Sequence, residues 1–290
     1  MARRVFSTWF FCLAATLATS ADAVSFTGIY AFGDSLTDTG NVCSVPCPGY
    51  PVPPYAAGRF SNGPVWIEGV AAGLGLSVSP SVSGGNNYAV GGATSTGVRN
   101  LQVPGYLSSV GGVASATALY VLWAGGNDGL GGGSPVAAAN NVVASINNLH
   151  LAGAQYFFVA NLPDLSLTPQ VLGNPLAHAF SVAFNSSLAS GLASLSGVTI
   201  YAYDAYAALN AAVANPALYG YTNVNTRCWN GVTACANPNQ YIFWDGVHPT
   251  AAAHAQTASA ALAAIPEPAA GSLVLLGLLV VASRRGRSAS

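Results

Sequence analysis

The sequence predicts a single doubly wound α/β domain, in which helices cover both faces of a mostly parallel sheet of about five strands. Three observations predict this three-layer arrangement. Strand-like apolar runs alternate with helix-like stretches through residues 24–265, several runs are apolar at every position, and no internal repeat is present. Continuous apolar runs are typical of parallel strands buried on both faces, and the length suits one domain with a large core.

The expected strands are short apolar segments separated by helix-like sequence. They are Gly28–Phe32, Asn87–Val90, Leu119–Trp123, Tyr156–Ala160, Val198–Tyr203 and Tyr241–Trp244.

Helices are expected between these strands. One begins at Pro64, one runs from Pro135 toward His150 with Ser134 as its N-cap, and the last follows Thr250. The clearest begins at Asn174-Pro175. Its apolar residues recur at steps of three or four and predict one buried stripe: Leu176, Phe180, Phe184, Leu188, Leu192 and Leu195.

The composition excludes several classes of function. Only 6% of the residues are charged, the formal net charge is −1, and all eight basic residues are arginines. Without lysine there is no Walker-type phosphate loop, Schiff base or Ser-Lys hydrolase. The chain lacks the basic stripe that nucleic-acid binding requires. Neither His150 nor His178 has a ligand partner nearby in sequence, so no metal or other cofactor is expected.

Residues 1–23 are predicted to be a secretory signal peptide. Arg3 and Arg4 precede the apolar run Val5–Ala18, and Ala21–Ala23 supplies a small-x-small cleavage pattern. The alternative is a transmembrane anchor, which is disfavoured because a bilayer span needs about 20 apolar residues.

The C-terminal segment, residues 266–290, has a distinctive order of parts. Pro266–Pro268 is followed by the apolar stretch Ala269–Ala282 and by Arg284, Arg285 and Arg287. This order resembles the PEP-CTERM sorting signal of Gram-negative, exopolysaccharide-forming bacteria. The resemblance implies export to the outside or outer surface of the cell, recognition by an exosortase-type membrane protease, and only transient contact with the membrane. A simple C-terminal anchor is the alternative.

The cysteines agree with export. Once Cys12 leaves with the signal peptide, Cys43, Cys47, Cys228 and Cys235 remain, and they allow three pairings. Local bridges, 43 to 47 and 228 to 235, are favoured because each pair lies in one loop rich in glycine, proline or asparagine. A zinc site is the alternative, but the spacing is wrong and no histidine is near.

Polar residues and glycines follow four of the expected strands, at the sheet edge where doubly wound folds carry their chemistry. A serine directly after a strand has its hydroxyl exposed at this edge. Backbone N–H groups near the serine and the glycines, and an asparagine amide, can donate hydrogen bonds to a negative charge there. An aspartate three residues before a histidine can orient the imidazole ring. Taken singly, each residue has an ordinary reading as a cap or turn. The residues are Ser35, the pair Gly91 and Gly92, Asn127, Asp245 and His248.

Together these segments resemble, in order, the four blocks of the GDSL (SGNH) lipase/esterase family. The blocks are Gly33-Asp34-Ser35-Leu36, Gly92 after Asn87, Gly125-Gly126-Asn127-Asp128, and Asp245-Gly246-Val247-His248; Gly58–Trp66 and Asn161–Leu165 are also similar.

The resemblance implies a flavodoxin-like fold and specific roles. Ser35 is the implied nucleophile, His248 the general base and then acid, and Asp245 the residue that orients His248. The N–H groups of Ser35 and Gly92 and the side chain of Asn127 are implied to form the oxyanion hole. Gly91 is the alternative to its neighbour Gly92.

The function implied is a secreted serine esterase or lipase that hydrolyses carboxylic esters through an acyl-enzyme. One alternative is an O-deacetylase of extracellular polysaccharide. Another is a non-enzymatic matrix or adhesion protein that retains the fold, although the intact set of five site residues argues against it. Asp34 and Asp38 also suggest a paired-carboxylate glycosidase, but they are interpreted as a turn residue and a helix-start residue.

Overall fold

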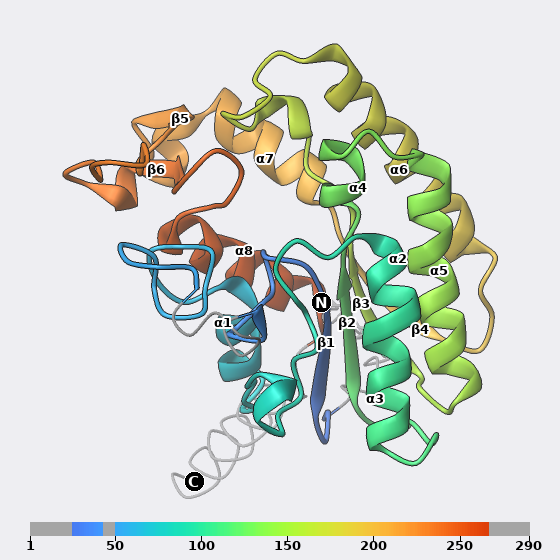
Figure 1. Ribbon diagram of the computed structural model, residues 1–290. Helices are drawn as coiled ribbons and strands as arrows, with labels where there is room; N and C mark the ends of the chain where they lie inside the picture. Colours follow the sequence, from blue (N-terminus) through green and yellow to red (C-terminus); the bar gives the residue numbers. More distant parts are fainter. Residues whose placement is uncertain (1–24, 43–49, 267–290) are drawn as a thin grey trace, which may run out of the picture. The chain divides into compact units, whose positions relative to one another are not determined.

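Four of the expected strands form the central sheet of the computed structural model, which describes residues 25–42 and 50–266. They are β1 (Ile29–Gly33), β2 (Leu119–Trp123), β3 (Tyr156–Ala160) and β4 (Thr199–Tyr203), paired in that order and all parallel (Figure 1). Every residue of β2 is buried, as its continuous apolar run predicts. The α/β fold with a parallel sheet is confirmed.

The predicted strand Asn87–Val90 is not a strand, although it lies beside β1. The N–H of Tyr88 donates to the carbonyl of Ala31, and the N–H of Val90 donates to that of Gly33. This segment forms one isolated β-bridge with β1, between Ala31 and Asn87, because the turn at Gly91 and Gly92 follows directly. The chain therefore reaches one side of β1 before it crosses to β2 on the other side. This reversal makes the carboxyl end of β1 the switch point, where such folds bind ligands.

The expected strand Tyr241–Trp244 is present as β6 (Tyr241–Phe243), but it does not join the central sheet. It pairs in parallel with β5 (Asn223–Arg227), which the sequence did not predict. The β5 sequence is mostly polar and half-buried or exposed, so it lacks the apolar pattern by which a strand is found.

The four expected helices are present as α1 (Trp66–Gly73), α5 (Pro135–Leu151), α6 (Pro175–Ala193) and α8 (Ala251–Ala264). Ser134, Asn174 and Thr250 cap their helices by accepting backbone N–H groups, as predicted for Ser134. Not predicted were α2 (Ser95–Gly97), α3 (Val103–Ser109), α4 (Gly126–Leu130) and α7 (Ala205–Ala214). Short single turns are Ser81–Ser83, Val98–Gln102, Leu165–Leu167, Pro216–Tyr219 and Pro238–Gln240.

The apolar stripe of α6 is only partly buried. Phe180, Phe184 and Leu188 lie in the core, but Leu176 in the first turn is 78% exposed, and Leu195 lies beyond the end of the helix. The prediction of one continuous buried stripe is therefore wrong at Leu176, whereas Leu192 and Leu195 are half-buried and pack against the core.

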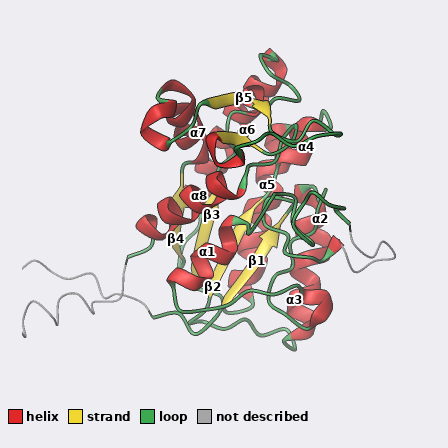
Figure 2. Cartoon of the chain, turned by 90° about the vertical axis from the view of Figure 1, so that its left-hand side faces the viewer, coloured by secondary structure: helices red, strands yellow, loops and turns green. Residues whose placement is uncertain are grey.

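Helices cover both faces of the sheet. One core cluster joins α3, α5 and α6 to residues of β1, β2 and β3, whereas α1 and α8 pack together on the opposite face (Figure 1). Figure 2 shows the four strands side by side, with β5 and α7 beyond their upper ends. The layered arrangement leaves the carboxyl ends of the strands for the site.

Several predictions lie outside the described residues. The signal peptide (1–23), the pair Cys43 and Cys47, and nearly all of the C-terminal segment (266–290) fall in residues 1–24, 43–49 and 267–290. In the described ranges, no helix combines the length and apolar character that crossing a membrane requires.

Candidate active site

Ser35 lies in a tight turn directly after β1. The carbonyl of Asp34 accepts the N–H groups of Thr37 and Asp38, and its carboxylate accepts that of Leu36 at 3.0 Å. The side chain of Gln102 fixes the strand end by bonding both backbone groups of Gly33, at 2.9 and 2.8 Å. Gly33 is needed because a Cβ there would collide with the carbonyl oxygen of Trp123. The serine is thus held on a well-braced turn.

Ser35, His248 and Asp245 form one chain of hydrogen bonds. Ser35 Oγ lies 2.8 Å from His248 Nε2, and His248 Nδ1 lies 2.7 Å from Asp245 Oδ2. Asp245 Oδ1 accepts the backbone N–H groups of Val247 and His248, which closes the tight turn after β6. The structure brings together the three residues that the sequence predicted, across 213 positions of the chain.

The Asp245 carboxylate stays ionised although it is largely buried. Burial opposes ionisation, but the hydrogen bond and charge of His248, with two backbone N–H groups, outweigh it and lower the pKa of Asp245 to about 2. An ionised Asp245 accepts the proton on His248 Nδ1. This leaves Nε2 as the acceptor for the Ser35 hydroxyl.

Tyr55 is a residue of this site that the sequence analysis missed. Its hydroxyl donates to Asp245 Oδ2 at 2.7 Å, and its ring packs edge-on against Trp244. Burial and this bond raise the pKa of the Tyr55 hydroxyl, so it remains a donor. No local pattern marks Tyr55, because its partner lies 190 positions away.

The geometry separates Gly92 from Gly91. The N–H of Gly91 donates to Asp38 Oδ2 at 2.8 Å. Within the described residues, the N–H groups of Gly92 and Ser35 have no hydrogen-bond partner. Gly92 has a φ of +78°, which favours glycine. The backbone therefore leaves the N–H of Gly92 available to a ligand, and that of Gly91 occupied.

Asn127 is the second residue of the short helix α4 and is tied to the glycine turn. Its Nδ2 donates one hydrogen to the carbonyl of Ala93 at 2.9 Å, and the amide has a second hydrogen to donate. Asn127 and Ser35 line the same cavity. Gly92 is not among the residues that line that cavity. It directly precedes Ala93, whose carbonyl accepts the hydrogen bond from Asn127.

Asp38 does not start a helix, contrary to the prediction. It is fully buried in the loop after β1, where Oδ1 accepts the N–H groups of Gly40 and Asn41 at 2.8 and 2.7 Å. Because Oδ2 accepts the N–H of Gly91, Asp38 joins the serine loop to the glycine turn. The sequence pattern showed the carboxylate but not its partners.

Comparison with known proteins identifies the family. A profile described as "GDSL-like Lipase/Acylhydrolase" matches residues 29–261. This chain belongs to the GDSL family. It is 31% identical to the phosphatidylcholine-sterol acyltransferase of Aeromonas hydrophila, over 77% of this chain and 72% of that protein. It is 30% identical to esterase EstA of Pseudomonas aeruginosa, over 82% of this chain and 47% of EstA.

A solved GDSL structure shows the same fold. The chain is 18% identical to a lipolytic G-D-S-L protein from Veillonella parvula, with a TM-score of 0.51 over 81% of this chain and 96% of that one. The chain spans about half the length, or less, of several curated relatives that it matches.

A cavity of about 190 Å³ opens at the GDSL serine and extends toward α7 and α8. Its walls are mostly apolar. Asp34 lies in the lining beside Ser35, where burial raises its pKa to about 6 although the N–H of Leu36 acts in the opposite direction. A second, more polar hollow also borders His248 and includes Gln170 and Arg227.

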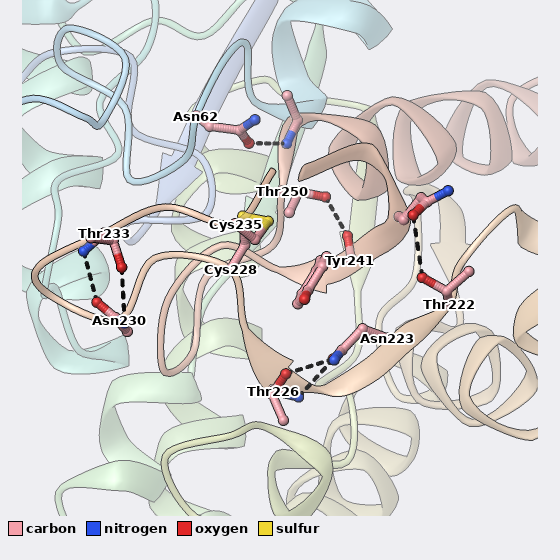
Figure 3. Close-up of a disulfide and its surroundings, with 12 residues drawn as sticks. Asn62, Thr222, Asn223, Thr226, Cys228, Asn230, Thr233, Cys235, Tyr241 and Thr250 are labelled. Carbon is pink, nitrogen blue, oxygen red and sulfur yellow. Dashed lines mark hydrogen bonds between the residues drawn. A yellow bond between two sulfur atoms is a disulfide. The ribbon is translucent and has the colours of Figure 1, made fainter. Parts of the chain in front are cut away.

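The predicted bridge between Cys228 and Cys235 is present in this GDSL chain (Figure 3). The N–H of Cys228 donates to the carbonyl of Phe243, and that of Trp229 donates to the carbonyl of Trp244. The bridged loop therefore contacts the end of β6, directly before Asp245. The predicted pair Cys43 and Cys47 lies outside the described residues.

The remaining histidines lie apart from the GDSL site. His178 Nδ1 lies 2.7 Å from Asp164 Oδ2, and His150 Nδ1 bonds the carbonyl of Ala154. His254 is buried on α8, where its Nδ1 accepts the N–H of Trp66. In the part of the chain that the structure describes, no group of three or more His, Cys, Asp or Glu could hold a metal ion.

Proposed function

We propose that this protein is a serine hydrolase of carboxylic esters, with Ser35 as nucleophile, His248 as base and Asp245 as its orienting residue. The observation that carries the proposal is the unbroken chain of hydrogen bonds from Ser35 Oγ through His248 to Asp245, at 2.8 and 2.7 Å. Membership of the GDSL family and the similarity to an esterase and an acyltransferase support acyl-ester chemistry.

In the first half of the reaction, Ser35 Oγ attacks the ester carbonyl carbon as its proton passes to His248 Nε2. The bond from that carbon to the alcohol oxygen then breaks, and His248 returns the proton to the departing alcohol. In the second half, water gives a proton to His248 and attacks the acyl carbon. The acid leaves, and Ser35 regains its proton.

The oxyanion of each tetrahedral intermediate is assigned to three donors. They are the N–H groups of Ser35 and Gly92 and the free hydrogen of Asn127 Nδ2. This assignment is supported by the absence of partners for those N–H groups within residues 25–42 and 50–266, and by the bond that holds the Asn127 amide against Ala93.

Labelling and turnover test this function directly. The full chain, with its disulfide formed, is treated with a small fluorophosphonate and assayed with p-nitrophenyl esters and an acetylated polysaccharide, beside Ser35→Ala. We expect labelling at Ser35, and ester turnover that the variant lacks. A folded protein that is neither labelled nor active on any ester contradicts the proposal and favours the non-enzymatic reading.

Export is the second part of the proposal. It is supported by the signal-peptide pattern of residues 1–23, the PEP-CTERM-like tail and the bridge between Cys228 and Cys235, since disulfides persist in oxidising compartments. The proposed partners are the export machinery and an exosortase-type protease. Mass spectrometry of the protein from fractionated Gram-negative cells is expected to find it outside the cell, without residues 1–23 and without the C-terminal tail. An intact intracellular chain contradicts export.

A further inference from the structure

We propose that the apolar cavity beside Ser35 binds the acyl chain of the ester, so that the substrates are esters of medium or long acyl chains rather than acetyl esters. This inference rests on the proposed function. It adds the substrate class and names the residues that set the length of the chain.

The cavity begins at the reacting groups and ends between two helices. Ser35, Asn127 and His248 line one part of it, and α7 and α8 line another. The helical wall consists largely of small apolar side chains: Ala208, Leu209 and Ala212 from α7, and Ala253 and Ala260 from α8. Ala212 and Ala253 also belong to the apolar cluster that joins α7 and α8 to β5 and β6. An acyl group bound to Ser35 therefore has an apolar path toward these helices.

Several polar groups of the wall, away from Ser35, are hydrogen-bonded within the protein. The Tyr221 hydroxyl donates to Gln256 Oε1 at 2.8 Å, Gln256 Nε2 donates to the carbonyl of Tyr219 at 2.7 Å, and the Thr168 hydroxyl donates to the carbonyl of Leu165. Among the described lining residues, the buried indole N–H of Trp123 has no hydrogen-bond partner. Such a wall offers little to the hydroxyl groups of a sugar but suits a hydrocarbon.

The polar hollow fixes the direction in which the ester lies. His248 borders both hollows, and the second is lined by Gln170, Arg227 and Asp245. A polar alcohol portion fits on that side, which leaves the acyl portion for the apolar side.

The size of the cavity decides between acetyl and longer groups. A methyl group is comparable to one water molecule, which takes about 30 Å³ in the liquid. It leaves most of the cavity, about 190 Å³, unfilled. Each methylene buried there is expected to raise kcat/KM about fourfold until the cavity is full.

The test is a chain-length profile of kcat/KM for p-nitrophenyl esters from acetate to palmitate, measured with the full chain. We expect kcat/KM to rise from acetate through the medium-length esters. Ala212→Leu and Ala208→Leu are expected to move the optimum to shorter chains, because kcat/KM falls further for palmitate than for acetate. Two variants are used, and thermal unfolding is followed for both, so that the chain-length profile is taken from folded protein.

Ala214→Leu is the matched control, because Ala214 is exposed on the same helix and does not line the cavity. Its profile is expected to match that of the unchanged protein. The acyl-chain inference is overturned if activity is highest on acetate. It is also overturned if Ala212→Leu and Ala208→Leu fold and show the same profile as the control. In either case, fluorophosphonate labelling of Ser35 still supports the proposed function. If Ser35 is not labelled and no ester is hydrolysed, the proposed function fails, and the inference fails with it.

Discussion

The hydroxyl of Tyr55 and the imidazole of His248 bond the same carboxylate oxygen, Oδ2 of Asp245, each at 2.7 Å. Backbone N–H groups occupy the other oxygen of Asp245. The carboxylate is therefore held from both sides, and the orientation of His248 depends on a residue from a distant loop.

Tyr55→Phe is expected to lower kcat about tenfold and to leave KM nearly unchanged. A hydrogen bond to a charged group contributes about 1.5–3 kcal/mol, and only part of it is expected to be expressed in the transition state. Steady-state kinetics on a soluble ester measures the effect. Tyr50→Phe is the control, because among the described residues the Tyr50 hydroxyl has no hydrogen-bond partner. Equal kcat values for the two variants remove Tyr55 from the positioning of Asp245.

Ser35→Ala is expected to abolish turnover without loss of fold. The change removes one oxygen atom, while the turn is held by Asp34 and Gln102, which are unaffected. Activity assays beside circular dichroism check both halves of the prediction. Turnover close to that of the unchanged protein contradicts the assignment of the nucleophile.

Asn127→Asp is expected to lower kcat by about 10²–10³-fold, the usual cost of losing one oxyanion donor. Aspartate keeps the size of the side chain but donates no hydrogen. Asn127→Ala tests the same donor without adding a charge. If kcat is unchanged in the alanine variant, Asn127 is not part of the oxyanion hole.

The buried His254 is expected to make the fold less stable in mild acid. Burial, with a smaller effect of the charge on His248, lowers its pKa from 6.5 to about 3. Between these values the unfolded chain binds a proton that the folded protein excludes, so this contribution to stability declines as the pH falls from 6.5 toward 3. Asp34 acts in the opposite sense, because its raised pKa favours the folded state as the pH falls below about 6.

The effect of His254 is isolated by measuring the change in Tm between pH 7 and pH 5 for the unchanged protein and for His254→Gln. The fall in Tm is expected to be smaller in the variant, in which Asp34 is retained. His150→Gln, on α5, removes a histidine elsewhere and is expected to behave like the unchanged protein. Identical falls in all three proteins contradict the role of His254.

Replacing both Cys228 and Cys235 with serine is expected to lower the free energy of unfolding by about 2 kcal/mol, from loop closure alone. Because the bridged loop contacts Phe243 and Trp244, kcat is expected to fall as well. Urea unfolding and ester kinetics measure the two effects. A stability that does not change shows that the backbone contacts hold the loop without the bridge.

The sequence predicts what is local in this molecule. The four central strands are mostly apolar runs, and Ser35, Asn127, Asp245 and His248 each lie within five residues of the end of a predicted strand, so short patterns reveal them. β5 is polar, and for that reason it escapes a search based on hydrophobic periodicity.

Contacts between distant segments leave no such pattern. The bond between Tyr55 and Asp245 and the bond between Asp38 and Gly91 join separate loops, and each required the folded structure to be seen. The same holds for the acyl cavity, because its wall combines alanines of α7 and α8 that resemble ordinary helix residues in sequence.

The separation of 213 residues between Ser35 and His248 has a consequence for biosynthesis. In the proposed mechanism, the serine leaves the ribosome early, whereas His248, its proposed proton acceptor, is made only after most of the domain. A nascent chain that already contains the first strands has no base for its serine. Reactivity at Ser35 therefore arises late, when the last strand and helix have docked, and a chain that ends before residue 245 is inert.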